Sequence, residues 1–409
     1  MTTPLQSRCE FPSCDKFENL QACEYCQYVF YCSREHRRSH LSQHKEICTE
    51  LATACSRYRA EYRKLKRFSG NRKCPGQPFK NAIGRFTEFH ETQDYRNAKR
   101  TVVEVLLKAG TKEALEACVE HGLEMHRLCW NGASVWLRNQ TPLYMIMLGR
   151  DQDAYDFSKW LFMDDEDRDI YSKDAIHYSR RDLEDLVPFN LVNGTLDSEI
   201  WESVQDPFEP LDFIRKKIPN EYYCLSMILI KIMLLQDMKD LENMRVLEKL
   251  PVLQKNQEIF DLIQDQIPST EVFRRDTALR TLDKEDFDDL RDLLDQHINR
   301  LFVIIGGDRF HFWTAMLKRG GPEYRPSDEA WYKMFEKLPG ASQVIQSRLE
   351  MARQGDQRLL KFCDCSYQKY QRGEISKGFV SCNAQRCFFG RKMESYWIGR
   401  IGMAISLFL

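Results

Sequence analysis

Eight cysteine and histidine residues near the N-terminus stand in four close pairs. The pairs are Cys9-x4-Cys14, Cys23-x2-Cys26, Cys32-x3-His36 and His44-x3-Cys48. A short loop between two cysteines turns tightly enough to place both sulfurs on one ion, and ligands four residues apart share one face of a helical turn. Structural zinc takes four nitrogen or sulfur ligands in a tetrahedron, so four pairs predict two closed sites holding two zinc ions.

The segment that carries these pairs is too short to fold on apolar burial alone. Chains near or below about 40 residues usually need a metal or disulfides. Structural zinc supplies roughly 10–16 kcal/mol at neutral pH, more than any core this segment could build. We therefore expect the metal to hold the first fifty residues together.

The stretch from Tyr31 to Cys48 resembles the second half of a MYND zinc finger. In that family the pairs interleave, so that the first and third bind one ion and the second and fourth bind the other. The resemblance implies a first zinc on Cys9, Cys14, Cys32 and His36, and a second on Cys23, Cys26, His44 and Cys48. Two departures are visible: the Cys9–Cys14 gap is wider than the usual two residues, and His36 stands where many members have cysteine.

Two neighbouring positions bear on how the finger works. His40 lies four residues from both His36 and His44, so it is an alternative ligand, although the family spacing favours His44. MYND fingers resemble adaptor modules that bind short proline-containing peptides along a groove. A tryptophan three residues before the penultimate ligand often helps to form that groove. This sequence has Leu41 there, which leaves the usual peptide preference open.

The composition is that of an ordinary soluble chain. It has 409 residues, 43% hydrophobic and 30% charged, with a formal net charge of −1 that favours neither nucleic acid nor an anionic membrane. The first eight residues lack the apolar run of a secretory signal. We expect an intracellular, reducing compartment, nucleus or cytoplasm, where clustered cysteines bind metal rather than form disulfides. The apolar run in residues 222–236 is broken by Lys231 and shorter than the about 20 residues that span a bilayer.

Beyond the finger the apolar spacing predicts helices and almost no strands. The predicted helices are 51–67, 97–109, 111–129, 141–149, 153–162, 222–244, 257–266, 284–302 and 342–353. Gly110 is a plausible helix stop and Thr111 a plausible N-cap, whereas Asp164–Asp169 suggests an acidic loop. The predicted fold is thus mostly α: a small cross-braced two-zinc finger and an all-α helical array, for which an α-solenoid like the tetratricopeptide repeat is one arrangement.

The same features divide the chain into four predicted segments. They are a finger at 1–50, a basic helix and linker at 51–78, a helical domain at 79–355 and a cysteine-containing C-terminal segment at 356–409. A finger followed by a long helical region also resembles a group of uncharacterised fungal MYND-type proteins, on the phrases at 148–157 and 305–308. That likeness implies no activity.

Several weaker sequence signals have a structural explanation as well as a functional one. Cys363, Cys365, Cys382 and Cys387 could form another metal site, but Cys-x-Cys is a tight pair for one ion, so unrelated thiols are favoured. The basic stretch 57–73, with interleaved aromatics, could contact phosphates, but a solvated helix face with its tyrosines packed inward is commoner. His297 and His311 lack a catalytic partner, Asn193-Gly194 indicates a turn, and the apolar tail 396–409 is too short for a span.

The function that fits best is a zinc-stabilised protein–protein interaction protein, adaptor or regulatory, and not an enzyme. Its expected partners are proteins rather than nucleic acid. One alternative is a lysine methyltransferase of the SET type, because some of these carry MYND fingers. The chain has no Asn-His dipeptide like that of their methyl-donor motif, and the predicted helices do not fit a β-rich SET fold. The other alternative is a transcription regulator with direct DNA contact through the basic linker.

Overall fold

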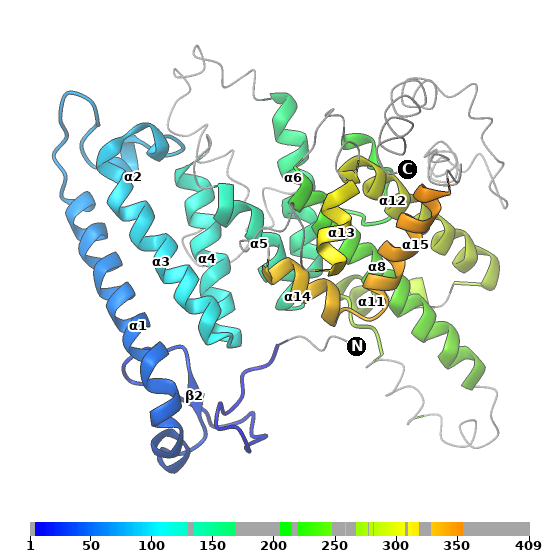
Figure 1. The fold of residues 1–409 in the computed structure, drawn as a ribbon, viewed down its shortest axis with the longest axis horizontal. Coiled ribbons are helices and arrows are strands. Elements are labelled where there is room, and N and C mark those ends of the chain that lie inside the picture. The colour runs from blue at the N-terminus through cyan, green and yellow to red at the C-terminus, as the bar shows by residue number, and fades with distance from the viewer. Residues whose placement is uncertain are drawn as a thin grey trace. The chain divides into compact units, whose positions relative to one another are not determined.

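A computed structural model of the chain describes residues 5–129, 135–167, 205–214, 220–247, 258, 267–276, 278–280, 282–306, 310–318 and 329–354. Within them the fold is mainly α-helical, as the sequence predicts (Figure 1). The first fifty residues also contain a two-stranded sheet. Contacts divide the chain into two compact units. The N-terminal unit contains Pro4–Leu148, and the C-terminal unit contains Gly149–Arg168 and the residues from Gln205 onward.

The N-terminal unit begins with a short hairpin and continues as helices that each pack on the next. Its elements are β1 (Gln21–Ala22), β2 (Phe30–Tyr31), α1 (Arg34–Lys66), α2 (Pro78–Asn81), α3 (Gln93–Ala109), α4 (Lys112–Leu128) and α5 (Val135–Met147). β1 and β2 pair antiparallel. Helix α1 packs on α3, α3 on α4, and α4 on α5 (Figure 1).

Helix α1 is one continuous helix of 33 residues, longer than the helix 51–67 that the sequence predicts. It begins where the Ser33 side chain accepts a hydrogen bond from the His36 backbone N–H at 3.2 Å, which satisfies one of the unpaired donors of the first turn. The predicted segment boundary at residue 50 therefore lies inside α1. The last finger ligands and the first ten residues of the basic stretch 57–73 therefore lie on one continuous helix.

The inner face of α1 carries apolar residues at helical spacing. Leu51, Ala54 and Leu65 are buried. Between them, the rings of Tyr58 and Tyr62 lie 5.6 and 6.4 Å from the ring of Tyr95 on α3. These apolar and aromatic residues hold α1 against α3 and leave the charged residues of α1 on its outer side.

The turn between α3 and α4 confirms two predictions. Gly110 ends α3 with a φ of 66°, a left-handed conformation that glycine adopts at low cost. Thr111 caps α4, because its hydroxyl accepts a hydrogen bond from the Ala114 N–H at 3.2 Å. The two helices are thus joined by a tight connection.

The C-terminal unit is built around one buried helix. Its elements are α6 (Asp151–Asp167), α8 (Glu221–Leu247), α11 (Glu271–Arg275), α12 (Lys284–Gly306), α13 (Phe310–Lys318), α14 (Glu329–Lys337) and α15 (Ala341–Arg353), with 3-10 turns at Leu211–Phe213 and Ala278–Arg280. From Tyr222 to Leu234 every residue of α8 is buried, with α6, α12 and α15 packed against it. The apolar run that the sequence shows to be too short for a membrane span thus forms the buried core of this unit.

Two buried carboxylates on neighbouring helices fasten α11 in this unit. Asp237 of α8 accepts hydrogen bonds from the backbone N–H of Ser269 and of Thr270, each at 2.8 Å. Asp151 of α6 accepts one from the Glu271 N–H at 2.9 Å. Because the first N–H groups of a helix have no partner within the helix, these carboxylates satisfy them and fix the start of α11.

Some local predictions need correction. The acidic stretch from Asp164 was expected to be a loop, but α6 continues to Asp167, since no Gly or Pro interrupts it. The sequence also predicts neither α13 nor α14, which have nine residues each and leave only a short periodic signal. Among the described helices, none combines the length and apolarity that a membrane crossing requires.

Other sequence predictions concern positions outside the described residues. These are the C-terminal cysteines 363, 365, 382 and 387, the tail 396–409, the turn at 193–194 and the helix 257–266 apart from Glu258. His297 is described. It is buried in α12, and its Nδ1 lies 3.2 Å from the Nζ of Lys231.

The close approach of α4 and α5 gives a first testable prediction. A Cβ added to Gly122 would lie 2.2 Å from the Thr141 hydroxyl oxygen, so the Thr141 side chain or one of the two helices must shift. We expect Gly122→Ala to lower the free energy of unfolding by about 1–3 kcal/mol in urea titrations. Thr141→Ala should relieve the clash, so the double variant should lose less than the sum of the two single variants. Strictly additive losses would contradict this packing.

Candidate metal centre

The structure gathers the eight predicted ligands into two separate clusters. In each cluster one donor atom per residue lies within 4.8 Å of every other. The first cluster contains Cys9, Cys14, Cys32 and His36, and the second contains Cys23, Cys26, His44 and Cys48. These are the same two sets that the resemblance to MYND fingers implies. Cys9, whose spacing departs from the family, lies in the first cluster with the others.

The distances between donors match a tetrahedral zinc ion. With bonds of about 2.3 Å to sulfur and about 2.0–2.1 Å to nitrogen, a tetrahedron puts two sulfurs about 3.8 Å apart and a sulfur and a nitrogen about 3.6 Å apart. The sulfurs of Cys14 and Cys32 are 3.7 Å apart, and those of Cys23 and Cys48 are 3.8 Å apart. Both clusters therefore have the size that zinc requires.

The two histidines present different ring nitrogens. Nδ1 of His36 lies 3.5 Å from the Cys9 sulfur and 3.3 Å from the Cys32 sulfur. Nε2 of His44 lies 3.5 Å from the Cys26 sulfur. Each distance is close to the sulfur–nitrogen edge of the tetrahedron. Each cluster thus offers zinc three thiols and one imidazole, a donor set typical of structural sites.

Backbone hydrogen bonds shape the loops that carry the cysteines. The Cys23 N–H donates to the Val29 carbonyl at 2.7 Å, and the Gln27 N–H donates to the Cys23 carbonyl at 2.8 Å. Gln27 has a φ of 67°, a left-handed turn that brings the chain back after Cys26. In the other loop the Cys9 N–H donates to the Lys16 carbonyl at 2.9 Å. The turns and the hairpin therefore fix the course of the loops from which the sulfurs of each cluster converge.

Aromatic rings orient the two histidines. Phe11 stacks on His36, with ring centroids 4.5 Å apart and an interplanar angle of 19°. Tyr31 is buried and meets His44 edge to face at 6.1 Å. The Tyr31 hydroxyl is 3.0 Å from Nδ1 of His40. His40 thus faces this tyrosine instead of a cluster, a role that ligand spacing does not reveal.

The thiols within each cluster differ in pKa: burial raises the pKa of Cys9, but hydrogen bonds outweigh it and lower the value to about 7, whereas at Cys48 and Cys32 the shift is upward. Burial, and then the neighbouring Cys26 and Cys23, raise the pKa of the Cys48 thiol to about 12. Burial and the hydrogen bonds of Cys14 and Cys9 likewise raise the pKa of Cys32 to about 11. A divalent cation binds the thiolate form, so the donor set fits zinc better than it fits free thiols.

The finger is attached to the helices of the N-terminal unit at more than one point. The Thr111 hydroxyl, which caps α4, also donates a hydrogen bond to the Tyr28 carbonyl in the finger at 2.7 Å. Nζ of Lys108 at the end of α3 lies 2.7 Å from a carboxylate oxygen of Glu50 on α1. A single threonine hydroxyl thus uses both its donor and its acceptor capacity to join the finger to α4.

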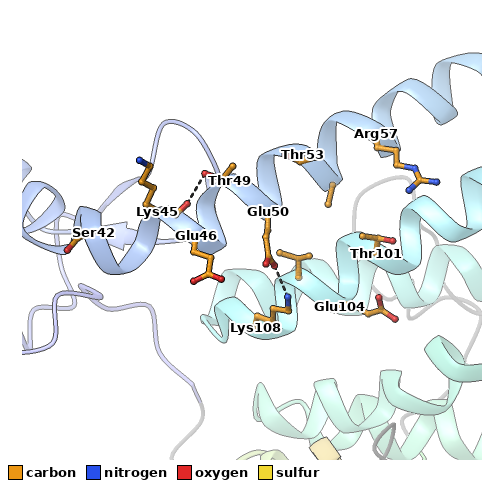
Figure 2. Close-up of a pocket in the computed structure, with 12 residues that line it drawn as sticks. Ser42, Lys45, Glu46, Thr49, Glu50, Thr53, Arg57, Thr101, Glu104 and Lys108 are labelled. Atoms are coloured by element: carbon orange, nitrogen blue, oxygen red, sulfur yellow. Dashed lines mark hydrogen bonds and ion pairs between the residues drawn. The ribbon is translucent and has the colours of Figure 1, made fainter.

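An open groove, lined by polar residues together with Ala54 and Val105, runs between α1 and α3 next to this attachment (Figure 2). It has a volume of about 850 Å³, and the Glu50–Lys108 ion pair crosses it. The groove is lined by Ser42, Lys45, Glu46, Thr49, Glu50, Thr53, Ala54, Arg57, Thr101, Glu104, Val105 and Lys108. Its lining begins within the finger and continues along α1.

The alternative ligand His40 allows a matched test of the second cluster. We expect His44→Gln to lower the zinc content of the full-length protein from two ions to about one, because the remaining three donors lose zinc to a competing chelator. His40→Gln, one turn away on α1, should leave the content at two. The measurement is metal analysis after dialysis against the chelator. Equal zinc contents in the two variants would contradict the second cluster.

The Thr111 hydroxyl gives a test of the finger's attachment. Thr111→Ala removes the cap of α4 and leaves the Tyr28 carbonyl without its partner, so we expect a loss of about 1–3 kcal/mol in the free energy of unfolding. Thr111→Ser keeps the hydroxyl and should remain near the wild type. The check is the urea midpoint of each variant. A midpoint for Thr111→Ala as high as that of Thr111→Ser would exclude the dual role.

Comparison with known proteins agrees with this geometry. The sequence matches the family model of the MYND finger over residues 9–48. No curated protein and no solved structure matches the chain. The matched residues contain both clusters, the hairpin and the first turns of α1. Residues 9–48 of this chain are a MYND-type zinc finger with two cross-braced sites for two zinc ions.

Proposed function

We propose that this protein is an adaptor or regulatory protein whose MYND finger binds a short segment of a partner protein. The observation that carries the proposal is the exposure of large apolar side chains on the finger. Phe17, Tyr25 and Leu41 are 53%, 74% and 51% exposed. Apolar and aromatic side chains left in water on a metal-closed scaffold are typical anchors of protein interfaces.

Charged groups lie beside these apolar side chains and support recognition of a peptide. The Arg37 guanidinium is 6.0 Å from the ring centroid of Tyr25 and forms a 3.0 Å ion pair with Glu24. Leu41 follows Arg37 by one helical turn on α1, so the two side chains share a face. A partner segment would meet an aromatic ring, a fixed cation and an aliphatic side chain within a small area.

Leu41 also bears on which segment is bound. It occupies the position where MYND fingers often have tryptophan. A leucine offers no flat ring for a proline to stack on, so we propose that apolar side chains other than proline contribute more to binding here. The groove between α1 and α3 begins at Ser42, next to Leu41 in the sequence, and its polar lining residues provide hydrogen-bonding groups for flanking residues of the partner.

The donor sets support a binding role over a catalytic one. Catalytic zinc keeps an open coordination position for water or substrate, whereas each cluster here already supplies four protein donors. The helical fold also differs from the β-rich fold of SET methyltransferases, since the described residues contain one sheet of two strands. The cysteines of the finger form no disulfide and serve as metal donors, which fits a reducing compartment, so we propose that the protein acts in the nucleus or the cytoplasm.

Selection of peptides on the full-length protein tests this proposal. We expect wild-type protein to enrich short peptides with a shared apolar motif, and Tyr25→Ser with Leu41→Ser to weaken their binding by tenfold or more, in line with about 1.4 kcal/mol or more for lost anchors. The matched control replaces Val246 and Leu247, which are 62% and 41% exposed on α8, by serine. The control should bind as the wild type does.

Two results would count against the proposal. One is the absence of enriched peptides on a protein that carries two zinc ions per chain. The other is equal binding by the Tyr25/Leu41 and the Val246/Leu247 variants. Zinc content serves as the folding control, because the substituted residues are not donors of either cluster.

A further inference from the structure

Positive charge is concentrated at the end of α1 and in the loop that follows it. Residues 57–80 contain nine Lys and Arg residues and a single acidic residue, Glu61. The chain as a whole has 60 Lys and Arg against 61 Asp and Glu. The overall balance therefore conceals a strongly basic segment, and this segment lies at the opposite end of α1 from the zinc clusters.

Four of these cations form a stripe at the end of α1, three on its outer face and the fourth, Arg67, at its C-cap. Arg59, Arg63, Lys66 and Arg67 follow one another at intervals of four, three and one residues, which places them on one side of the helix. All four are exposed. We call these four residues the basic stripe. It covers about 12 Å along the helix axis, at about 1.5 Å per residue.

The stripe has no acidic partner among the described residues. Lys64, on another side of the helix, pairs with Glu61 at 3.3 Å and with Asp94 at 3.4 Å. The members of the stripe form no ion pair in the described part of the chain. Arg63 donates only to the Arg59 carbonyl, and Lys66 lies over the Tyr62 ring. Their positive charges therefore face water and are not neutralised by an ion pair with any described acidic side chain.

The aromatic side chains of Tyr58 and Tyr62 in this segment are half-buried and engaged in contacts within the protein, that of Tyr62 also with Lys66 of the stripe. Tyr58 and Tyr62 are turned inward, where Tyr58 meets Tyr95 and His121, and Tyr62 meets Phe79 and Tyr95. Proteins that bind single strands stack bases on exposed aromatic rings. This face offers none. Its chemistry suits a ligand that presents regularly spaced negative charges and needs no stacking.

The stripe also lacks the apolar anchors of a protein interface. The exposed large hydrophobic side chains of the described residues are Phe17, Tyr25, Leu41, Val246 and Leu247. None belongs to residues 57–80. Protein interfaces draw most of their energy from buried apolar and aromatic groups, whereas duplex backbones are bound by cations alone, through released counterions. The phosphates of a duplex fit this face better than a protein surface does.

We propose that the basic stripe binds the phosphate backbone of double-stranded DNA without reading its sequence. Each arginine can donate two hydrogen bonds to one phosphate. Four contacts are few, so we expect weak binding, with a Kd on the order of 10⁻⁴–10⁻⁶ M at physiological salt. The site is separate from the finger and does not depend on its peptide ligand. It would place a protein held by the finger next to DNA.

The test compares two full-length variants of equal net charge. One carries Arg59→Gln, Arg63→Gln and Arg67→Gln in the stripe. The other carries Lys239→Gln, Lys284→Gln and Lys333→Gln, three exposed lysines of the C-terminal unit. Binding to a labelled 20-base-pair duplex is followed by fluorescence anisotropy across a salt series. Zinc content and helicity confirm that each variant is folded.

We expect the stripe variant to bind the duplex at least tenfold more weakly than the wild type at low salt. Its slope of log affinity against log salt should be smaller by about 3, one unit for each lost phosphate contact. The lysine control should match the wild type in both respects. The Tyr25/Leu41 finger variant should also bind DNA normally, which separates this proposal from the peptide-binding one.

Three outcomes would overturn the proposal. The first is no measurable binding of the wild type to the duplex at low salt. The second is equal weakening in the stripe variant and in the lysine control, which would show a general charge effect. The third is displacement of the duplex by polyglutamate at equal charge concentration as efficiently as by unlabelled DNA, which would identify an acidic protein segment as the ligand.

Discussion

Closure of two tetrahedra by zinc is the constraint on which the N-terminal part of this molecule depends. The first cluster joins Cys9 to His36, 27 residues apart, and the second joins Cys23 to Cys48, 25 residues apart. Each ion therefore closes a loop whose ordering costs conformational entropy, in a segment with little apolar surface to offset it. Burial, together with the neighbouring donors, raises the pKa values of Cys32 and Cys48, so thiolates at these two positions are disfavoured until a cation binds between the donors.

The metal sites also determine the position of α1, and α1 positions much else. His36, His44 and Cys48 lie on this helix, whose later turns pack on α3. The finger is therefore not joined to the following helices through a flexible linker. Thr111 and Glu50 add a hydrogen bond and an ion pair between the finger side and the following helices. Because one continuous helix carries ligands at its start and core residues further on, loss of zinc should disturb the packing of α1 as well as the finger loops.

Spacing alone predicts the ligand pairs, since each short interval has a local geometric reason. It does not predict which pairs share an ion; that came from the resemblance to a family, and the structure shows the same grouping. Spacing also does not show which of His40 and His44 is the metal ligand. In the folded structure His40 contacts the Tyr31 hydroxyl instead of a cluster, and spacing along the sequence does not reveal this contact. The caps at Ser33 and Thr111 are local, yet the link from Thr111 to Tyr28 joins residues 83 apart, and no local pattern reveals it.

The net charge of −1 argued against nucleic acid at the level of the whole chain, but charge acts locally in salt solution. At physiological ionic strength the screening length is about 8 Å, so an exposed group feels only charges within a turn or two of helix. Helix α1 has 33 residues and is about 50 Å long, several screening lengths. The apolar finger surface at its start and the basic stripe at its end are therefore electrostatically independent. A single rigid helix can hold two surfaces of different chemistry at a fixed separation.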